Sequence, residues 1–228
     1  MNTILSASKQ GVFALAALLM WSVEVCAQEK FEQTTCGNAP IYDDKRDYRD
    51  RSTAAKRFSI EDNKLYHINP AARRISAGEY SRSVMSDLDW TLTRFPNHPA
   101  ALELLIRYVL AGGKIYEFSQ AECYFQWAHE FAPDDDKMLL AEGYFHWRRS
   151  NLQRAIRSYE SVLEIDPNSA VAHYNLGLVY IELNDYEQAL KHAQAAYAQS
   201  YPLSGLRDKL KAVGRDIPAV PVVGSGPN

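Results

Sequence analysis

Residues 170–202 read AVAHYNLGLVYIELNDYEQALKHAQAAYAQSYP, and this stretch indicates the architecture most clearly. It contains two apolar helical patterns, Ala170–Leu183 and Tyr186–Ala198, joined by two residues. A link that short forces two helices to run antiparallel. Gly177 on the first helix and Ala189 on the second are small, so the two backbones can approach closely. The stretch therefore predicts a tight helical hairpin.

The same features recur upstream with a period of 34 residues. Ala121, Ala155 and Ala189 are spaced by this interval, and so are Gly143 and Gly177. A period of this length is typical of stacked helix pairs and predicts an all-α array, not one globular core. Four further helices are expected upstream, at Ala100–Ala111, Phe118–Phe131, Asp135–Arg149 and Leu152–Ile165.

The rest of the chain divides around this array. Residues 28–62 show no sustained hydrophobic period and are expected to form an extended or partly ordered lead-in. Residues 63–96 fit a degenerate helix pair, which Pro70 interrupts. A last amphipathic helix, about Leu203–Val213, is expected to cap the array, because the final repeat otherwise exposes its stacking surface. Residues 97–214 are then expected to hold three repeats and this helix, and residues 215–228 are expected to form a flexible tail.

The first 27 residues have the pattern of a secretory signal. Lys9 precedes the apolar run GVFALAALLMWSV at residues 11–23, and small residues at Val25 and Ala27 fit a cleavage site before Gln28. The run is shorter than the roughly 20 apolar residues of a membrane-spanning helix. We therefore expect export to the periplasm, with a retained N-terminal membrane anchor or secretion as alternatives.

Cleavage after Ala27 would leave two cysteines, Cys36 and Cys123. Two cysteines in an exported chain predict a disulfide between them, and a pair of unpaired thiols is the alternative.

The chain resembles the tetratricopeptide repeat family most closely at residues 170–202. Asn175, Leu176, Gly177, Tyr180, Asp185, Tyr186, Ala189 and Ala196 fall on the family motif there. Gly143, Ala155 and Tyr159 match it one repeat earlier, whereas Val109 replaces the glycine two repeats earlier. The resemblance implies a right-handed superhelical array with repeats at about 102–135, 136–169 and 170–202. The stretches FPNHPAAL and SYPLSGLRDKLKAVG also look like a group of exported bacterial members without an assigned activity.

In this family the first helix of each pair lines an inner groove, so the resemblance also implies a set of groove residues. These are Ile106, Leu110, Leu140, Tyr144, Trp147, Arg148, Tyr174, Asn175, Leu178 and Ile181, with Arg107, Lys114 and Glu182 along the edges. Two interpretations stay open: the groove takes a peptide of another protein on its aromatic residues, or residues 28–62 of this chain or a partner helix fill it.

Several other kinds of site find no support in the sequence. A formal charge of −3 gives no basic excess for nucleic acid. The six histidines do not pair with cysteine or acid at metal-ligand spacing, although His146 and His173 could approach each other. No nucleophile motif is present. Some family members hold a C-terminal carboxylate with Lys, Asn and Arg side chains, but Ile106, Leu140 and Tyr174 occupy the places that such a set needs.

We therefore expect no cofactor, no metal and no catalysis. The sequence predicts a non-enzymatic scaffold of the bacterial cell envelope that binds a protein or peptide of unknown identity. One alternative is an accessory subunit of a secretion or polysaccharide-export assembly that docks through the outer face and Trp90. Another is an enzyme with an unrecognised site. The oligomeric state stays open.

Overall fold

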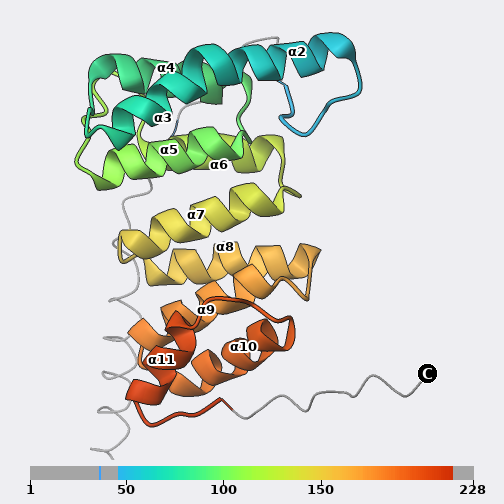
Figure 1. Ribbon diagram of the computed structural model, residues 1–228, viewed down its shortest axis with the longest axis vertical. Helices are drawn as coiled ribbons and strands as arrows, with labels where there is room; N and C mark the ends of the chain where they lie inside the picture. Colours follow the sequence, from blue (N-terminus) through green and yellow to red (C-terminus); the bar gives the residue numbers. More distant parts are fainter. Residues whose placement is uncertain (1–35, 37–45, 218–228) are drawn as a thin grey trace, which may run out of the picture. The chain divides into compact units, whose positions relative to one another are not determined.

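The computed structural model describes Cys36 and residues 46–217. The expected signal, the rest of the lead-in and the end of the tail lie outside these residues. All regular elements in the described part are helical (Figure 1). They are α2 (Ala54–Asn63), the π-helical turn η1 (Lys64–Ile68), α3 (Asn69–Ser76), α4 (Arg82–Arg94), α5 (Pro99–Leu110), α6 (Ala121–Phe131), α7 (Asp136–Arg148), α8 (Leu152–Ile165), α9 (Ala170–Glu182), α10 (Tyr186–Ala198) and α11 (Gly205–Ala212).

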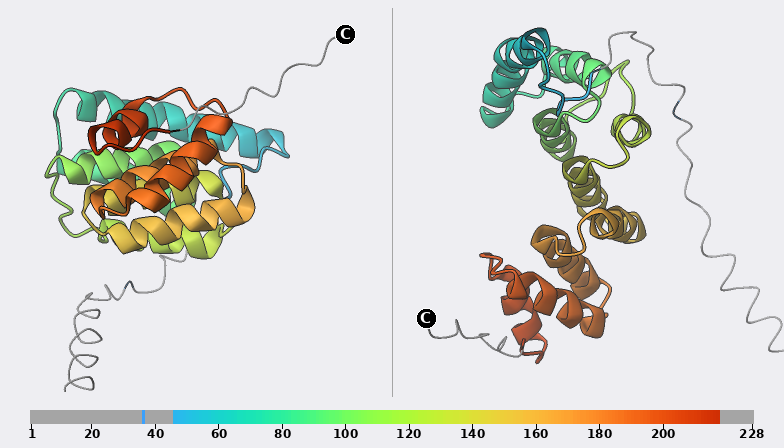
Figure 2. Two further views of the ribbon diagram at one scale, coloured as in Figure 1. Left: turned by 90° about the horizontal axis from the view of Figure 1, so that it is seen from below. Right: turned by 90° about the vertical axis from the view of Figure 1, so that its right-hand side faces the viewer.

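Helix pairs follow one another along the described part of the chain (Figures 1 and 2). Helices α7 and α8 pack closely, as do α9 and α10, and α8 contacts α9 to join the two pairs. Helix α11 packs on both α9 and α10 and so covers the end of the array. The predicted all-α solenoid of helix pairs with a terminal capping helix is confirmed.

The two glycines of the repeat sit where a helix meets a bulky side chain. A Cβ atom on Gly143 would lie 2.5 Å from the ring of Tyr159, and one on Gly177 would lie 2.4 Å from Cδ2 of Leu206 on α11. The backbone of Ala189 is farther from Gly177, at 3.4 Å. The sequence had paired each glycine with an alanine of the next helix. Ala189 does lie in contact range of Gly177, but the atoms nearest to each glycine belong to a larger side chain, Tyr159 on α8 or Leu206 on the capping helix.

The N-terminal helical region begins earlier than the sequence indicates. Helix α2 starts at Ala54, inside the expected lead-in, where the side chain of Thr53 accepts a hydrogen bond from the amide of Lys56. The helical path continues through η1, where the Asn69 amide bonds to the Lys64 carbonyl, five residues back. Pro70 follows at the start of α3. A π-helical turn places its carbonyl groups differently from an α-helix. The ring of Pro70 therefore does not interrupt the helical chain that continues from η1 into α3.

Two regular repeats end their first helices in the same way. Ser150 follows α7 and Asn184 follows α9, and both adopt left-handed backbone angles, with φ of 60° and 59°. The next amides, those of Asn151 and Asp185, bond back to the carbonyls of His146 and Tyr180. This pattern satisfies carbonyls that the helix end leaves free, and it allows the short links to α8 and α10.

Residues 46–53 of the lead-in lie against two loops through polar contacts. The buried Asn97 accepts a hydrogen bond from the amide of Tyr48, and its amide group donates to Asp47 and Asp135. Arg49 bridges Asp47 and the loop before α7, and its hydrogen bond lowers the pKa of Asp47 to about 2. We call this set of five residues the lead-in clasp (Tyr48, Asp47, Arg49, Asn97 and Asp135).

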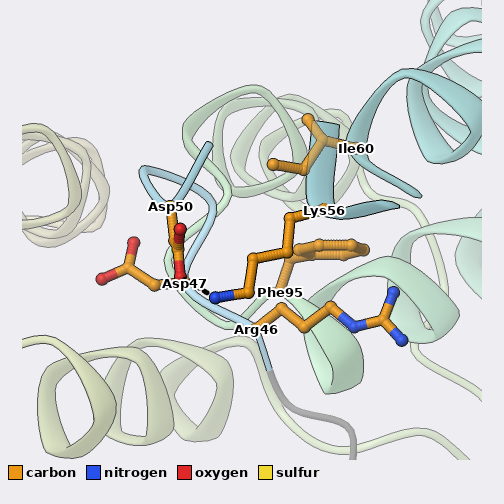
Figure 3. Close-up of a pocket in the computed structure, with 6 residues that line it drawn as sticks. All are labelled: Arg46, Asp47, Asp50, Lys56, Ile60 and Phe95. Atoms are coloured by element: carbon orange, nitrogen blue, oxygen red, sulfur yellow. Dashed lines mark hydrogen bonds and ion pairs between the residues drawn. The ribbon is translucent and has the colours of Figure 1, made fainter. Parts of the chain in front are cut away.

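A small pocket of about 110 Å³ lies beside the lead-in clasp (Figure 3). Ile60 and Phe95 form its apolar wall, and Lys56 reaches across it to pair with Asp50. Lys56 and Asp50 therefore neutralise each other there, and the residues around the pocket connect α2 with the loop that contains Phe95.

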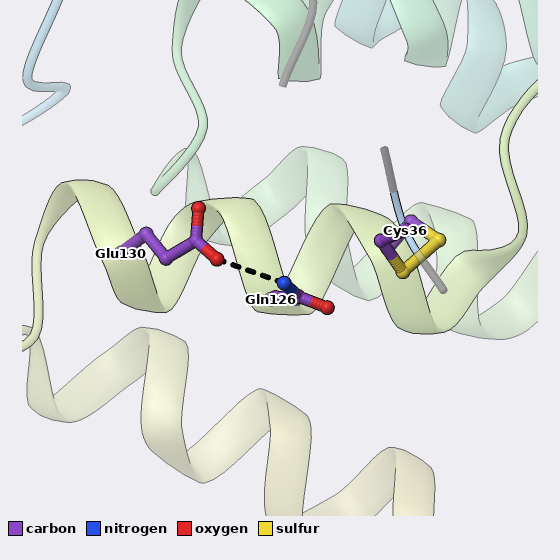
Figure 4. Close-up of a disulfide and its surroundings, with 4 residues drawn as sticks. Cys36, Gln126 and Glu130 are labelled. Carbon is purple, nitrogen blue, oxygen red and sulfur yellow. Dashed lines mark hydrogen bonds between the residues drawn. A yellow bond between two sulfur atoms is a disulfide. The ribbon is translucent and has the colours of Figure 1, made fainter. Parts of the chain in front are cut away.

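Cys36 lies beside α6, where its sulfur is bonded to that of the buried Cys123 (Figure 4). The two Cα atoms are 5.3 Å apart, within the range that a disulfide spans. The exposed face of the same helix carries a hydrogen bond from Gln126 to Glu130 one turn later. The disulfide fixes the lead-in to a second helix and not to the predicted groove.

Candidate functional site

The first helices α5, α7 and α9 contact one another in succession, whereas successive second helices make weaker or no contacts among the described residues. The three first helices therefore form one continuous surface, which we call the first-helix face. Two adjoining hollows lie on it. The N-terminal hollow is lined by Ile75, Tyr80, Ile106, Arg107, Leu110, Ala111, Tyr144 and Arg148. The C-terminal hollow is lined by Tyr144, Trp147, Arg148, Ser150 and Glu182.

The hollows bring together five of the ten predicted groove residues. Ile106 and Leu110 line the N-terminal hollow, Trp147 lines the C-terminal one, and Tyr144 and Arg148 line both. The predicted edge residues Arg107 and Glu182 also line them. Leu140 is half-buried against the core, while Asn175 and Ile181 are half-buried on α9 outside both linings.

The aromatic residues between the two hollows hold one another in place. The rings of Tyr144 and Trp147 meet edge to face, with centroids 6.1 Å apart. Arg148 donates to the Tyr144 hydroxyl at 2.8 Å, and the Trp147 indole N–H donates to Glu182 at 2.8 Å. These bonds order large side chains before any partner arrives, and Tyr144 is still 36% exposed. Ordered, exposed aromatic residues lose little entropy on binding and are frequent anchors of protein interfaces.

The C-terminal part of the predicted groove is covered by the chain itself. Tyr174 and Leu178 are each only 7% exposed and share a cluster with Leu206 and Leu210 of α11. The ring of Tyr201 lies 4.6 Å from that of Tyr174. Tyr174 is therefore a core residue under the capping helix, and the expectation that it anchors a bound peptide does not fit its place in the structure.

The described lead-in follows a different route from the groove. Residues 46–53 contact the loop before α5 and the loop before α7 through the lead-in clasp, and Cys36 contacts α6. The linings of the two hollows include no residue of this described stretch. Self-coverage of the first-helix face comes from α11 instead.

The sequence did not predict four of the residues that line the hollows: Ile75, Tyr80, Ala111 and Ser150. Ile75 and Tyr80 come from the irregular N-terminal part, where no repeat motif gives a register. The backbone carbonyl of Tyr80 accepts a hydrogen bond from the Tyr108 hydroxyl, which connects this segment to α5. Ser150 could have been found from the 34-residue interval that separates it from Asn184.

The histidines form structural contacts. The expected approach of His146 to His173 is replaced by a pair between His173 and His192, whose Nδ1 atoms are 2.9 Å apart. The Nε2 atom of His173 donates to the Pro167 carbonyl, and in the neutral ring its Nδ1 then accepts from His192. Burial, followed by the neighbouring His173 and Lys191, lowers the pKa of His192 to about 4. Burial also lowers the pKa of His146 to about 4.

Trp90, the residue expected at a docking edge, is half-buried between two side chains. Its ring stacks on His67 with centroids 4.1 Å apart, and the Arg94 guanidinium lies 4.2 Å from the ring centroid. These contacts give Trp90 a packing role within the N-terminal helices.

Comparison with protein families gives two matches in the C-terminal half. A model described as TPR repeat matches residues 148–184, and one described as Tetratricopeptide repeat matches residues 170–200. This is a tetratricopeptide repeat protein. Comparison with curated proteins gives no match. Tetratricopeptide repeats indicate a scaffold for protein interactions, and proteins built from them are generally non-catalytic. Among the helices described, none is long and apolar enough to cross a membrane.

Proposed function

We propose that this tetratricopeptide repeat protein is a non-enzymatic scaffold that binds a segment of another protein on its first-helix face. The observation that carries the proposal is the pair of adjoining hollows around Tyr144 and Arg148. An aromatic ring, an indole and a guanidinium lie together there on α7, between α5 and α9, so a partner meets a surface that is already ordered.

We further propose that the protein acts in the bacterial cell envelope, with the periplasm as its compartment. The signal-like first 27 residues support export. The bond between Cys36 and Cys123 supports an oxidising compartment, because cytosolic thiols are kept reduced. Mass analysis of the mature chain tests export: a chain beginning at Gln28 is expected, and an uncleaved cytosolic chain would contradict this part of the proposal.

Photo-crosslinking in cells tests the binding site. A photoreactive phenylalanine analogue replaces Tyr144, which lines both hollows, and in a matched control it replaces Gln153, which is exposed on the second helix α8. We expect a discrete protein adduct from position 144 and none of the same mass from position 153. Equal adducts at both positions, or no adduct at position 144, would count against the first-helix face as the binding site.

A further inference from the structure

The N-terminal hollow contains two arginines and no acidic residue. Arg107 makes a hydrogen bond of 3.3 Å to the Ser76 hydroxyl, and Arg148 makes one of 2.8 Å to the Tyr144 hydroxyl. Within the described part of the chain, neither guanidinium forms an ion pair with a carboxylate. Each guanidinium has five N–H donors, so both arginines keep donors for a ligand.

The two hollows differ in charge although they share Tyr144 and Arg148. In the C-terminal hollow, Glu182 opposes Arg148 and is bound by the Trp147 indole. The N-terminal hollow adds Arg107 and has no such acid. The positive charge of the first-helix face is therefore concentrated at the end of the hollows where α5 and α7 meet.

Apolar side chains form the remainder of the N-terminal hollow. Ile106 and Ile75 line it as buried residues, and the half-buried Leu110 and Tyr80 line it as well. A partner side chain that enters here removes apolar surface from water, while a group next to it reaches the guanidinium donors.

We propose that the N-terminal hollow binds a partner segment in which a carboxylate side chain adjoins a bulky apolar side chain. The apolar group packs on Ile106 and Leu110, and the carboxylate accepts hydrogen bonds from Arg107 and Arg148. This assignment rests on the proposed function and names the chemistry of its partner.

Fluorescence anisotropy with three peptide pools tests the assignment on the mature protein with its disulfide intact. Each pool consists of labelled octapeptides with random flanks around a fixed central pair: Glu-Leu, Gln-Leu or Lys-Leu. We expect the Glu-Leu pool to bind more tightly than the Gln-Leu pool and the Lys-Leu pool to bind least. Binding of the Glu-Leu pool should weaken as salt rises, because screening reduces the attraction between charges.

Three variants locate the effect. Arg107→Gln and Arg148→Gln should each weaken binding of the Glu-Leu pool about fivefold, and Lys209→Gln, an exposed change on α11, should leave it unchanged. Thermal melts within a degree of the parent protein show that the variants fold. Binding of the Gln-Leu pool should not respond to either arginine change.

The outcomes separate this inference from the proposed function. If the Glu-Leu and Gln-Leu pools bind equally and neither arginine variant changes binding, a peptide site exists but the carboxylate assignment is wrong. If no pool binds and position 144 gives no adduct in cells, both proposals fail. If no pool binds but position 144 gives an adduct, the proposed function stands and the assignment of an acidic and apolar partner segment is overturned.

Discussion

Helices α7 and α8 pack along each other closely, as do α9 and α10, whereas α5 and α6 of the preceding repeat make far fewer contacts. One position explains much of this difference. Gly143 and Gly177 stand on the first helices of the close pairs, and Val109 stands at the same place in the loose one. The links differ as well, because residues 149–151 and 183–185 suffice for the close pairs and residues 111–120 separate α5 from α6. A repeat can therefore lose its small residue and keep its place in the array.

Other interactions hold the loose repeat. The disulfide joins α6 to the lead-in, the lead-in clasp joins the loops before α5 and α7, and the Tyr124 hydroxyl of α6 donates to Asp89 of α4. The C-terminal repeats depend on packing, and the N-terminal region adds covalent and polar links over long distances in sequence. Each of the following predictions tests one side of this contrast.

The largest effect is expected from removal of the disulfide. Cys36→Ser leaves the buried Cys123 in place and opens a loop with a sequence separation of 87. In the chain-entropy model, the free energy of unfolding falls by up to about 4–5 kcal/mol. Urea unfolding measures the loss, and reduction of the parent protein should reproduce it while leaving the variant unchanged. An unaltered unfolding midpoint in both experiments would mean that the disulfide adds no stability.

The second effect compares equivalent positions in a close and a loose repeat. Gly177→Leu puts a side chain where Leu206 already lies, so α11 must move and stability should fall by roughly 1–3 kcal/mol. Val109→Leu adds one methylene at the half-buried equivalent position and should cost less than about 1 kcal/mol. Thermal melts of both variants give the comparison. Equal losses would show that the glycine does not distinguish the two repeats.

The third effect concerns a titrating group in the close repeats. The pKa of His192 is about 4, below the unfolded value of 6.5, because the side chain is buried. As pH falls below 6.5, this histidine binds a proton in the unfolded chain but stays neutral in the folded chain. Stability is therefore lost between pH 6.5 and 4. At pH 5.5 this histidine should reduce stability by about 1 kcal/mol relative to pH 7.5.

Variants at two histidines isolate that contribution. His192→Phe keeps a ring against Tyr180 and should make the loss of stability between pH 7.5 and 5.5 smaller by about 1 kcal/mol. The loss that remains comes from His98 and His146, because burial lowers the pKa of each to about 4 as well. His129→Gln changes an exposed residue of α6 and should change the pH profile much less, through the small effect of His129 on Glu142 alone. Raised pKa values at the half-buried Glu142 and Asp89 act in the opposite direction, so the comparison between variants is more informative than the total. An identical profile for His192→Phe would contradict the assignment.

The smallest effect concerns the helix ends. In the N-terminal region, Gly78 follows α3 and Gly112 follows α5 with positive φ, whereas the close repeats place Ser150 and Asn184 in the left-handed conformation. Ser150→Gly should raise stability by about 0.5–1 kcal/mol, and Asn184→Gly should raise it less, because asparagine tolerates this conformation better than serine. Urea unfolding of the two variants measures the difference. A loss of stability in Ser150→Gly would indicate that its side chain has a further role in the C-terminal hollow.

The contrast also explains what the sequence could predict. In the close repeats, the signals that define a helix are all local in the sequence: the apolar period, the short links and capping residues such as Ser169 and Asp185. The helix bounds there can therefore be predicted within one or two residues. Helix α2 was missed because it begins in a charged stretch without a hydrophobic period. The cover of α11 over Tyr174 was missed for a related reason: the family motif places a side chain on a helix face but does not say what packs on it.

The bond between Cys36 and α6 also has a mechanical consequence. Tension applied to the chain upstream of Cys36 enters the folded body at α6, because the covalent link is shorter than the path through α2 to α5. Those helices belong to a closed loop and cannot be pulled out end to end while the disulfide is intact. The first part of the body to bear a load from that direction is therefore α6, which is only loosely paired with α5 in its own repeat.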